Sequence, residues 1–315
     1  MSKALCVGIG RKEGEHIFHQ DAERFSKLLK THENGDPNFT TKLLTATGET
    51  YVTETSLRRS FRWLINSEED MAVFYYSGHG TVTEEGAFLC TEDRDPHDPG
   101  LAVNDLISMV NNNTRTKQVV IILDCCFAGG AGNNIQMKND VVQLRKGLSI
   151  LAASQDFEVS RYENYKSVFT DALEAGLRGE AADAQGHVTV ASLYYYADKL
   201  LNPWEQRPLL KTHTSHLRPI RKCNPRVEAN LMRQLTVHFP DPDSKFPLDP
   251  SYPGSSDLSD PAKLPVFRDL QELCRNALVE PVGEEHMYYA AMHNKSCQLT
   301  HQGKMYWRMV EKGMV

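Results

Sequence analysis

Strand-like and helix-like segments alternate through about the first 215 residues of the chain. Strand-like runs, each short and rich in apolar residues, occupy 4–9, 42–44, 71–76, 118–123, 148–152 and 208–211. Between them, apolar residues recur at helical spacing in 21–30, 57–65, 104–110, 168–177 and 190–201. This alternation predicts an α/β fold with a mostly parallel sheet flanked by helices. The run 118–123 is the most hydrophobic, which is typical of a strand buried on both faces.

The pattern changes after about residue 220. Seven of the fifteen prolines lie between residues 221 and 261. Because proline fixes φ and removes a hydrogen-bond donor, this density predicts an extended tether over 221–262. Helical periodicity returns after the tether, and it predicts a small helical or winged-helix-like module over 263–315. Thr189 and Thr300 each precede a helical range and are expected to cap it.

The first 220 residues form the expected α/β domain, and one long connection divides it. A loop at 130–147 begins in a glycine-rich stretch and is long for a connection inside a compact domain. It separates a large part, which ends at about residue 135, from a small part over 148–220.

Composition narrows the possible functions. Asp and Glu number 41 against 35 Lys and Arg, for a net charge of −6, and no long basic run occurs. We therefore expect no nucleic-acid or membrane partner. The N-terminus lacks the order of a signal peptide, and no run approaches about 18 apolar residues. Seven scattered Cys residues without a Cys-x-x-Cys pair indicate a reducing, cytoplasmic compartment and no structural zinc.

Two motifs that carry chemistry follow directly after strand-like runs. The first is Tyr-Ser-Gly-His-Gly over 76–80, and the second is Asp-Cys-Cys-Phe-Ala-Gly-Gly over 124–130. A thiol with a pKa of about 8.5 gains thiolate character beside an imidazole, which can then return a proton to a leaving amine. Cys126 and His79 are the predicted nucleophile and acid/base, and the amides of Gly80 and Cys126 could form an oxyanion hole. An isolated Gly-His-Gly is more often a turn, and Cys125 is interpreted as a buried spectator.

These two motifs resemble those of the metacaspase branch of the caspase-like cysteine peptidases. The usual forms there are Tyr-Ser-Gly-His-Gly and Asp-x-Cys-His-Ser-Gly, and the spacing of His79 and Cys126 is about that of caspases. Phe127 and Ala128 depart from the usual His-Ser beside the nucleophile. The resemblance extends over about residues 1–215 and does not cover the tail.

The resemblance also implies a substrate class. Metacaspases select Arg or Lys at P1 with an acidic pocket, whose residues correspond to Asp124, Ser77 and Asp21 here. Caspases hold P1 Asp with arginines, and neither motif of this chain contains one. Protein or peptide substrates with a basic P1 residue are therefore expected. Taken singly, Asp124 and Asp21 could instead be helix-capping residues, a role that is compatible with pocket lining.

Metal binding and self-processing are further implications of the resemblance. No cofactor is required, but Ca²⁺ is possible at Asp93, Asp95 and Asp105, although Asn104 replaces one carboxylate of the family's Asp-Asp pair. An ordinary solvated acidic loop is the alternative. Candidate self-processing sites in the long loop are Lys138, Arg145 and Lys146, and an activating protein or protease is a possible partner.

The function predicted from the sequence is that of a cysteine endopeptidase, and the resemblance implies a regulated effector of a prokaryotic stress or defence response. The alternative is a catalytically inactive scaffold that recruits partners through its C-terminal module. A nucleotide-binding domain is disfavoured because no glycine-rich phosphate-binding motif follows any strand. In the tail, Tyr288, Tyr289, Tyr306 and Trp307 are expected to form the core of the small module.

Overall fold

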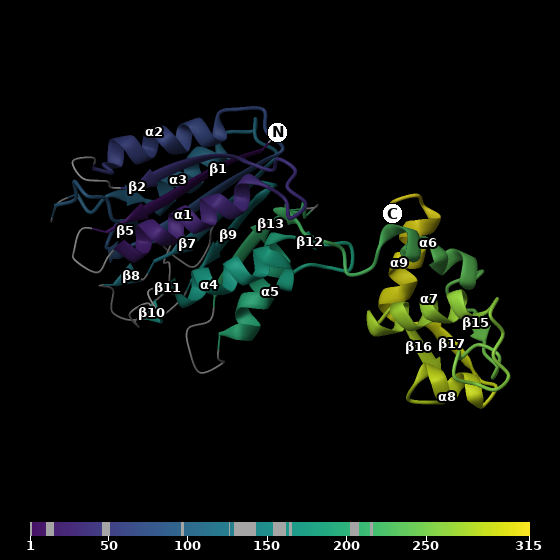
Figure 1. Ribbon diagram of the computed structural model, residues 1–315. Coiled ribbons are helices and arrows are strands. Elements are labelled where there is room, and N and C mark those ends of the chain that lie inside the picture. Colours follow the sequence, from purple (N-terminus) through teal and green to yellow (C-terminus); the bar gives the residue numbers. More distant parts are fainter. Residues whose placement is uncertain are drawn as a thin grey trace. The chain divides into compact units, whose positions relative to one another are not determined.

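The chain folds into two compact units, which we describe separately. The computed structural model describes residues 2–10, 16–45, 51–95, 98–125, 127–128, 143–153, 162–163, 166–201, 208–214 and 217–315. Unit 1 consists of Met1–Ala182 and His187–Asn224, and unit 2 of Asp183–Gly186 and Pro225–Val315 (Figure 1).

A six-stranded sheet forms the centre of unit 1. Its strands, in the order β13-β9-β7-β3-β1-β2, are β13 (Leu209–His213), β9 (Leu148–Ala152), β7 (Gln118–Asp124), β3 (Met71–Gly78), β1 (Ser2–Ile9) and β2 (Thr40–Thr45). Neighbouring strands are parallel except β13, which runs antiparallel to β9 at one edge. The predicted mostly parallel sheet is confirmed.

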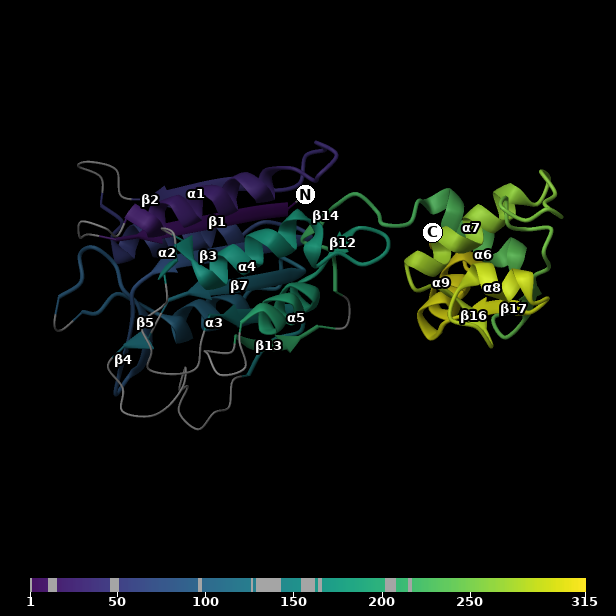
Figure 2. The same cartoon turned by 60° about the horizontal axis from the view of Figure 1, so that its bottom comes forward.

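Helices cover both faces of this sheet (Figure 2). On one face lie α1 (His16–Lys30), α4 (Val168–Ala175) and α5 (Val190–Leu200), whose apolar residues share a core with Val73 and Tyr75 of β3. On the other face lie α2 (Glu54–Ile65) and α3 (Val103–Asn111), which share a core with Phe74 and Tyr76. Alternate residues of β3 therefore point into different cores, as the pleat requires.

Short strands form small additional sheets at the carboxyl end and the periphery of the main sheet. A four-stranded sheet is ordered β6 (Leu101–Ala102), β5 (Gly86–Leu89), β4 (Gly80–Thr83) and β8 (Phe127–Ala128). Two further pairs join β10 (Tyr162–Glu163) to β11 (Lys166–Ser167) and β12 (His187–Val188) to β14 (Arg221–Lys222). A π-helical turn, η2 (Gly176–Glu180), extends α4.

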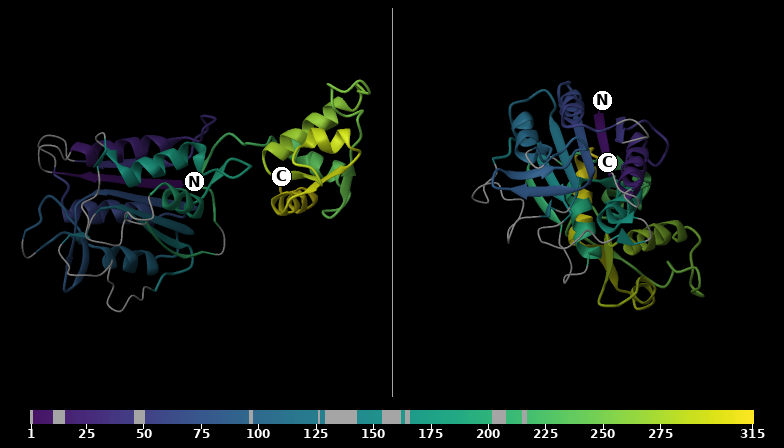
Figure 3. Two further views of the ribbon diagram at one scale, coloured as in Figure 1. Left: turned by 90° about the horizontal axis from the view of Figure 1, so that it is seen from below. Right: turned by 90° about the vertical axis from the view of Figure 1, so that its left-hand side faces the viewer.

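Unit 2 has its own hydrophobic core. It contains α6 (Ala229–His238), β15 (Lys245–Pro247), α7 (Leu264–Arg275), β16 (Val279–Val282), α8 (Met287–Met292), β17 (Ser296–Leu299) and α9 (His301–Glu311). Its strands form an antiparallel sheet in the order β15-β17-β16. Figure 3 shows this unit, coloured green to yellow, from two further sides. The largest buried side chains include Phe239, Phe267, Tyr306 and Trp307. As predicted, Thr300 caps α9, and Thr189 caps α5 in unit 1.

The proline-rich segment is not the tether that its composition predicts. Arg221 lies in unit 1, where its guanidinium donates to the carbonyls of Thr31 and Leu177. From Pro225 onward the chain belongs to unit 2, and α6 buries Met232 and Leu235 in the core of that unit. The prolines lie outside α6, so their high density does not prevent the apolar residues between them from packing.

The two aromatic pairs of the C-terminal unit differ in burial. Tyr306 and Trp307 are buried, as predicted, and the Trp307 indole donates to the carbonyl of Phe239 at 2.7 Å. Tyr288 and Tyr289 are instead 36% and 48% exposed, so the expectation that they belong to the core is wrong. Both lie on α8, whose buried residues are Met287, Ala290 and Ala291.

His238 should make the stability of unit 2 depend on pH. Its side chain is 8% exposed and stacks edge-on against Phe246, and this burial lowers its pKa, which Asp269 partly offsets. The unfolded chain therefore binds a proton more readily, so stability is full at neutral pH and falls as pH drops through about 6.5. We expect the midpoint for unfolding of unit 2 in the full chain to decrease between pH 7 and 5. In His238→Gln this dependence should weaken, while the exposed His286→Gln keeps it; identical pH slopes in all three proteins would contradict the assignment.

Candidate active site

Two pairs of aligned residues bring the two sequence motifs together at the carboxyl end of the sheet. Ser77 of β3 pairs with Asp124 of β7, and Gly80 of β4 pairs with Phe127 of β8. His79 lies between Ser77 and Gly80 in the chain. Cys126 lies outside the described residues, but the residues on either side of it, Cys125 and Phe127, are described.

The backbone of His79 is held from the face of the sheet covered by α2 and α3. Its carbonyl accepts a hydrogen bond from the backbone N–H of Cys90 at 3.0 Å. The buried Tyr76 hydroxyl lies 2.8 Å from the carbonyl oxygens of both His79 and Cys90. The loop that carries the candidate acid/base is thus tied to β3 before it and to Cys90, the residue that follows β5.

Close packing explains the glycine before His79, and an aromatic contact positions the imidazole. A Cβ on residue 78 would lie 2.8 Å from the Tyr76 hydroxyl oxygen and 2.9 Å from the Ile9 carbonyl oxygen, which is too close for a side chain. The imidazole of His79 is exposed and meets the ring of Phe18 edge-on, with centroids 5.2 Å apart. His79 can therefore reach a substrate while its backbone stays fixed.

The three residues predicted to form an acidic pocket lie together on the face covered by α1 and α4. Asp21 and Ser77 have no exposed surface, and Asp124 is 3% exposed. Asp21 does not cap a helix, because α1 begins at His16 and places Asp21 in its second turn, facing the sheet. The capping interpretation of Asp21 is therefore wrong, and the residue is free to serve the site.

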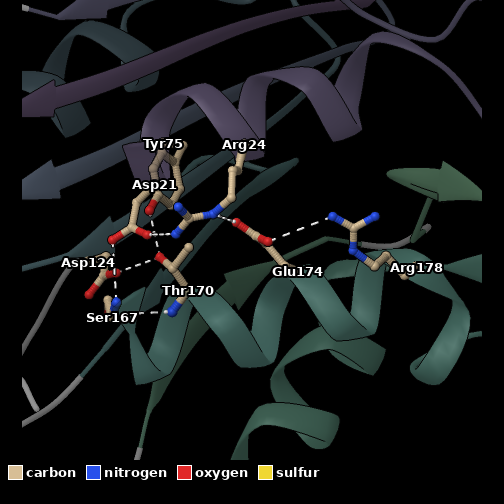
Figure 4. A network of polar contacts seen from close by, with 8 residues as sticks. All are labelled: Asp21, Arg24, Tyr75, Asp124, Ser167, Thr170, Glu174 and Arg178. Atoms are coloured by element: carbon tan, nitrogen blue, oxygen red, sulfur yellow. Dashed lines mark hydrogen bonds and ion pairs between the residues drawn. The ribbon is translucent and has the colours of Figure 1, made fainter. Parts of the chain in front are cut away.

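Hydroxyl and amide donors surround the two aspartates (Figure 4). Thr170 donates to Asp124 Oδ2 at 2.5 Å, and its Oγ1 also lies 2.5 Å from the hydroxyl of the buried Tyr75. The backbone N–H of Ser167, at the start of α4, donates to Asp21 Oδ2 at 3.4 Å. Ser77 Oγ is buried with no partner in hydrogen-bonding geometry among the described residues.

A third carboxylate and two arginines complete the network. Arg24, one turn after Asp21 on α1, contacts Asp21 Oδ1 with Nη2 and donates from Nε to Glu174 Oε1 at 2.9 Å. Glu174 is 3% exposed, and its other oxygen lies 3.8 Å from the more exposed Arg178. Of the three buried carboxylates, Asp21 and Glu174 thus contact Arg24, and Glu174 also lies near Arg178.

This arrangement perturbs the ionisation of both aspartates. Burial, followed by the negative charge of Asp124, raises the pKa of Asp21 to about 7, against the lowering effect of Arg24. Burial also raises the pKa of Asp124, although hydrogen bonds from Ser167 and Thr170 favour its charged form. A cation that enters this cluster would relieve the accumulated negative charge.

The candidate metal residues have separate protein partners. Asp93 accepts a hydrogen bond from the backbone N–H of Glu54 at 3.0 Å, and Asp105 forms an ion pair with Arg58 at 2.6 Å. Asp95 Oδ1 accepts from the N–H of Asp98 at 2.9 Å. Within the described ranges no three His, Cys, Asp or Glu side chains are grouped to hold a metal ion. Dependence on Ca²⁺ stays a prediction.

Of the candidate self-processing sites, Arg145 is held by hydrogen bonds to backbone carbonyls. Its guanidinium donates to the carbonyls of Val110, Thr116 and Lys146 at 2.7–2.8 Å. Lys146 is exposed, but the next residue, Gly147, donates to the carbonyl of His213 and accepts from the N–H of Val119. Cleavage at either position would require this segment to leave the sheet, and Lys138 lies outside the described residues.

Several residues of the site were not predicted from the sequence. Thr170, Ser167 and Glu174 come from α4 or its cap, far from both motifs in the chain. The sequence does not indicate that they contact Asp124, Asp21 and Arg24, respectively. Arg24 could have been noticed, because it stands three residues after Asp21 on the same helical face.

The fold and the site together define a caspase-like domain, with a mostly parallel sheet whose β3 and β7 ends carry a His-Gly and an Asp-Cys-Cys segment. The sequence matches the family model of the caspase domain over residues 3–223. The chain therefore belongs to the caspase domain family, a family of cysteine peptidases. No protein with a curated description matches the sequence.

One of two similar solved structures reaches a TM-score of 0.50 and supports the fold. The structure of protein GSU0716 from Geobacter sulfurreducens has 15% sequence identity and a TM-score of 0.50, and the match covers 68% of this chain and 94% of that one. For caspase-1 from Spodoptera frugiperda the values are 14%, 0.49, 70% and 90%. Separately, none of the described helices combines the length and apolar character needed to cross a bilayer.

Tyr76→Phe tests the attachment of the His79 loop. Removing the hydroxyl leaves two buried carbonyl oxygens with fewer donors, which should lower the free energy of unfolding of unit 1 by about 1–3 kcal/mol. Denaturant titration measures this change, and Tyr196→Phe, at a half-buried tyrosine of α5, is the matched control. Equal effects of the two substitutions would contradict the role of Tyr76.

Proposed function

We propose that the chain is a cysteine endopeptidase that hydrolyses protein substrates after Arg or Lys. Cys126 is the nucleophile, His79 the acid/base, and the amides of Gly80 and Cys126 the oxyanion donors. The observation that carries this proposal is the alignment of the two motifs at the sheet edge, next to a buried cluster of carboxylates.

The alignment supports the Cys–His pair. The pairs Ser77–Asp124 and Gly80–Phe127 each join residues that are 47 positions apart in the chain. His79 and Cys126 have the same separation and lie between these pairs in sequence. The described neighbours of Cys126 in the chain thus belong to the same strand ends as the described neighbours of His79, which supports the proposed pair.

The chemistry of that pair is acyl transfer. The Cys126 thiolate attacks the scissile carbonyl, and the tetrahedral oxyanion accepts hydrogen bonds from backbone amides. His79 gives a proton to the leaving amine, and the acyl-enzyme forms as the C–N bond breaks. Water, from which His79 removes a proton, then attacks the thioester and releases the acid product with the thiol.

The charge of the pocket supports a basic P1 residue. Asp21, Asp124 and Glu174 are buried, and Arg24 is the one cation that contacts any of them at under 3 Å among the described residues. When all three carboxylates are ionised, negative charge is therefore in excess. A guanidinium or ammonium group could bind Asp124, Ser77 and Asp21 together. These residues match the pocket of the metacaspase branch, to which we assign the chain.

Regulation and location follow from the same resemblance. We assign the enzyme to the cytoplasm and to a prokaryotic stress or defence response, with activation by self-processing at Lys138, by a partner protein or protease, or by Ca²⁺. An inactive scaffold is the less favoured alternative, because a scaffold has no chemical need for an aligned Cys–His pair.

Substitution of the dyad and of the pocket should have different kinetic effects. Cys126→Ala should lower kcat/KM for Arg- and Lys-ended reporter peptides by a factor on the order of 10⁴ or more. Asp124→Asn should mainly raise KM, by about tenfold, since it removes charge from the P1 site. Assays with and without Ca²⁺, and before and after limited proteolysis, complete the measurement. If the wild-type protein cleaves no such peptide under any of these conditions, the proposed activity is wrong.

Processing should occur before residue 143. Because Arg145 is bound through its guanidinium and Gly147 through its backbone, mass spectrometry of self-cleaved protein should find new termini among residues 129–142, with Lys138 as the P1 residue. Lys138→Ala should slow processing, and Arg145→Lys should leave the cleavage position unchanged. A terminus at residue 146 or 147 in the folded protein would contradict this expectation.

A further inference from the structure

Asp21 lies between two groups of opposite character. On one side it meets Asp124 and the N–H of Ser167, and on the other it meets Arg24, which Glu174 holds in turn (Figure 4). Arg24 belongs to the helix that carries Asp21, so its guanidinium approaches the carboxylate from behind, on the side away from Asp124.

We propose that Arg24 is a positioning residue for the P1 pocket, held in place by Glu174, and that it keeps Asp21 in the charged form that binds the P1 cation. This inference rests on the proposed function, and it adds a determinant outside the residues that would touch the substrate. Arg24 acts through Asp21 and does not itself contact the P1 side chain.

The physical argument is the balance of charge. The charged and titratable groups facing Asp21 are Asp124 from β7, Tyr75 from β3, Glu174 from α4 and Arg24 from α1, with Arg178 beyond Glu174. Asp124 and Glu174 disfavour an anionic Asp21, and within the described part of the chain Arg24 is the one adjacent cation that favours it. Since the pKa of Asp21 is raised to about 7, small changes in this balance alter its charge near neutral pH.

Glu174 has two opposing effects on Asp21. It fixes the Arg24 guanidinium through the Nε–H, and it adds a negative charge that disfavours ionisation of Asp21. In Glu174→Gln the amide oxygen still accepts from Nε while the negative charge is removed. Removing the charge of Arg24 should therefore raise the pKa of Asp21, and removing the charge of Glu174 should lower it.

The experiment measures binding of acetyl-arginine methylamide to the Cys126→Ala protein between pH 5.5 and 9. Binding should strengthen as pH rises through about 7, because Asp21 becomes charged, whereas the neutral isostere acetyl-citrulline methylamide should show no such rise. Arg24→Met should move the midpoint upward by about one pH unit, with affinity recovering at pH 9, and Glu174→Gln should move it downward. Arg24→Lys should stay close to the parent protein.

Arg178→Gln is the matched control. Arg178 is 60% exposed and lies 3.8 Å from Glu174, so its removal should change the midpoint by less than about 0.3 unit. The proposal would be overturned if Arg24→Met and Glu174→Gln shifted the pH midpoint of binding in the same direction, or if neither shifted it. If the pair were purely structural, both variants would lose affinity for the arginine ligand, and raising the pH would not restore it. If Arg24→Met does not fold, as judged by circular dichroism, Glu174→Gln and Arg24→Lys decide the result.

The readouts also separate this inference from the proposed function. Cleavage after Arg by the wild-type protein, with a pH midpoint of binding that does not respond to Arg24 or Glu174, refutes the inference alone. Arginine binding with the expected shifts, but without cleavage by the wild-type protein, refutes the peptidase activity alone.

Discussion

The in-register pairing of β3 with β7 is the constraint on which the site depends. Because the two strands are parallel and adjacent, their carboxyl ends meet at one edge, and Ser77 stands beside Asp124. The pleat sends Tyr75 and Ser77 to the α1 face and Tyr76 to the opposite face, where its hydroxyl holds the loop of His79. A slip of one residue would exchange these faces and place a phenol where the pocket needs a small hydroxyl.

Burying carboxylates so close together is unfavourable unless the protein supplies compensation. Here the compensation comes from several elements, namely a guanidinium on α1, a threonine hydroxyl on α4 and a backbone amide at the start of α4. The contacts come from two helices that are far apart in the chain, so the cluster can form only after both helices pack on the sheet. The anionic character of the site is thus a product of tertiary structure.

The sequence predicted the parts of the fold that depend on local pattern. The apolar runs located all six strands of the main sheet, and the glycines and the two motifs located its functional edge. The position of Asp21 in its helix was predicted less well. The sequence placed it at the start of a helix over 21–30, but α1 begins at His16 and Asp21 lies inside it. The contacts of Thr170 and Glu174 could not be predicted, since they depend on how α4 packs. Proline density was misleading in unit 2, where Met232, Leu235 and Phe239 are buried between the proline-containing turns.

Because β9 lies inside the main sheet and not at its edge, its position has a consequence for cleavage of the loop that precedes it. This strand lies between β7 and β13 and is hydrogen-bonded to both, and the turn before it is fastened by Arg145 and Gly147. A nick upstream would therefore leave both pieces interlocked in one sheet, so the cut changes only the freedom of the loop ends. Since a peptide bond does not re-form spontaneously, such a molecule would stay cut for the rest of its lifetime while its two pieces remain in one sheet.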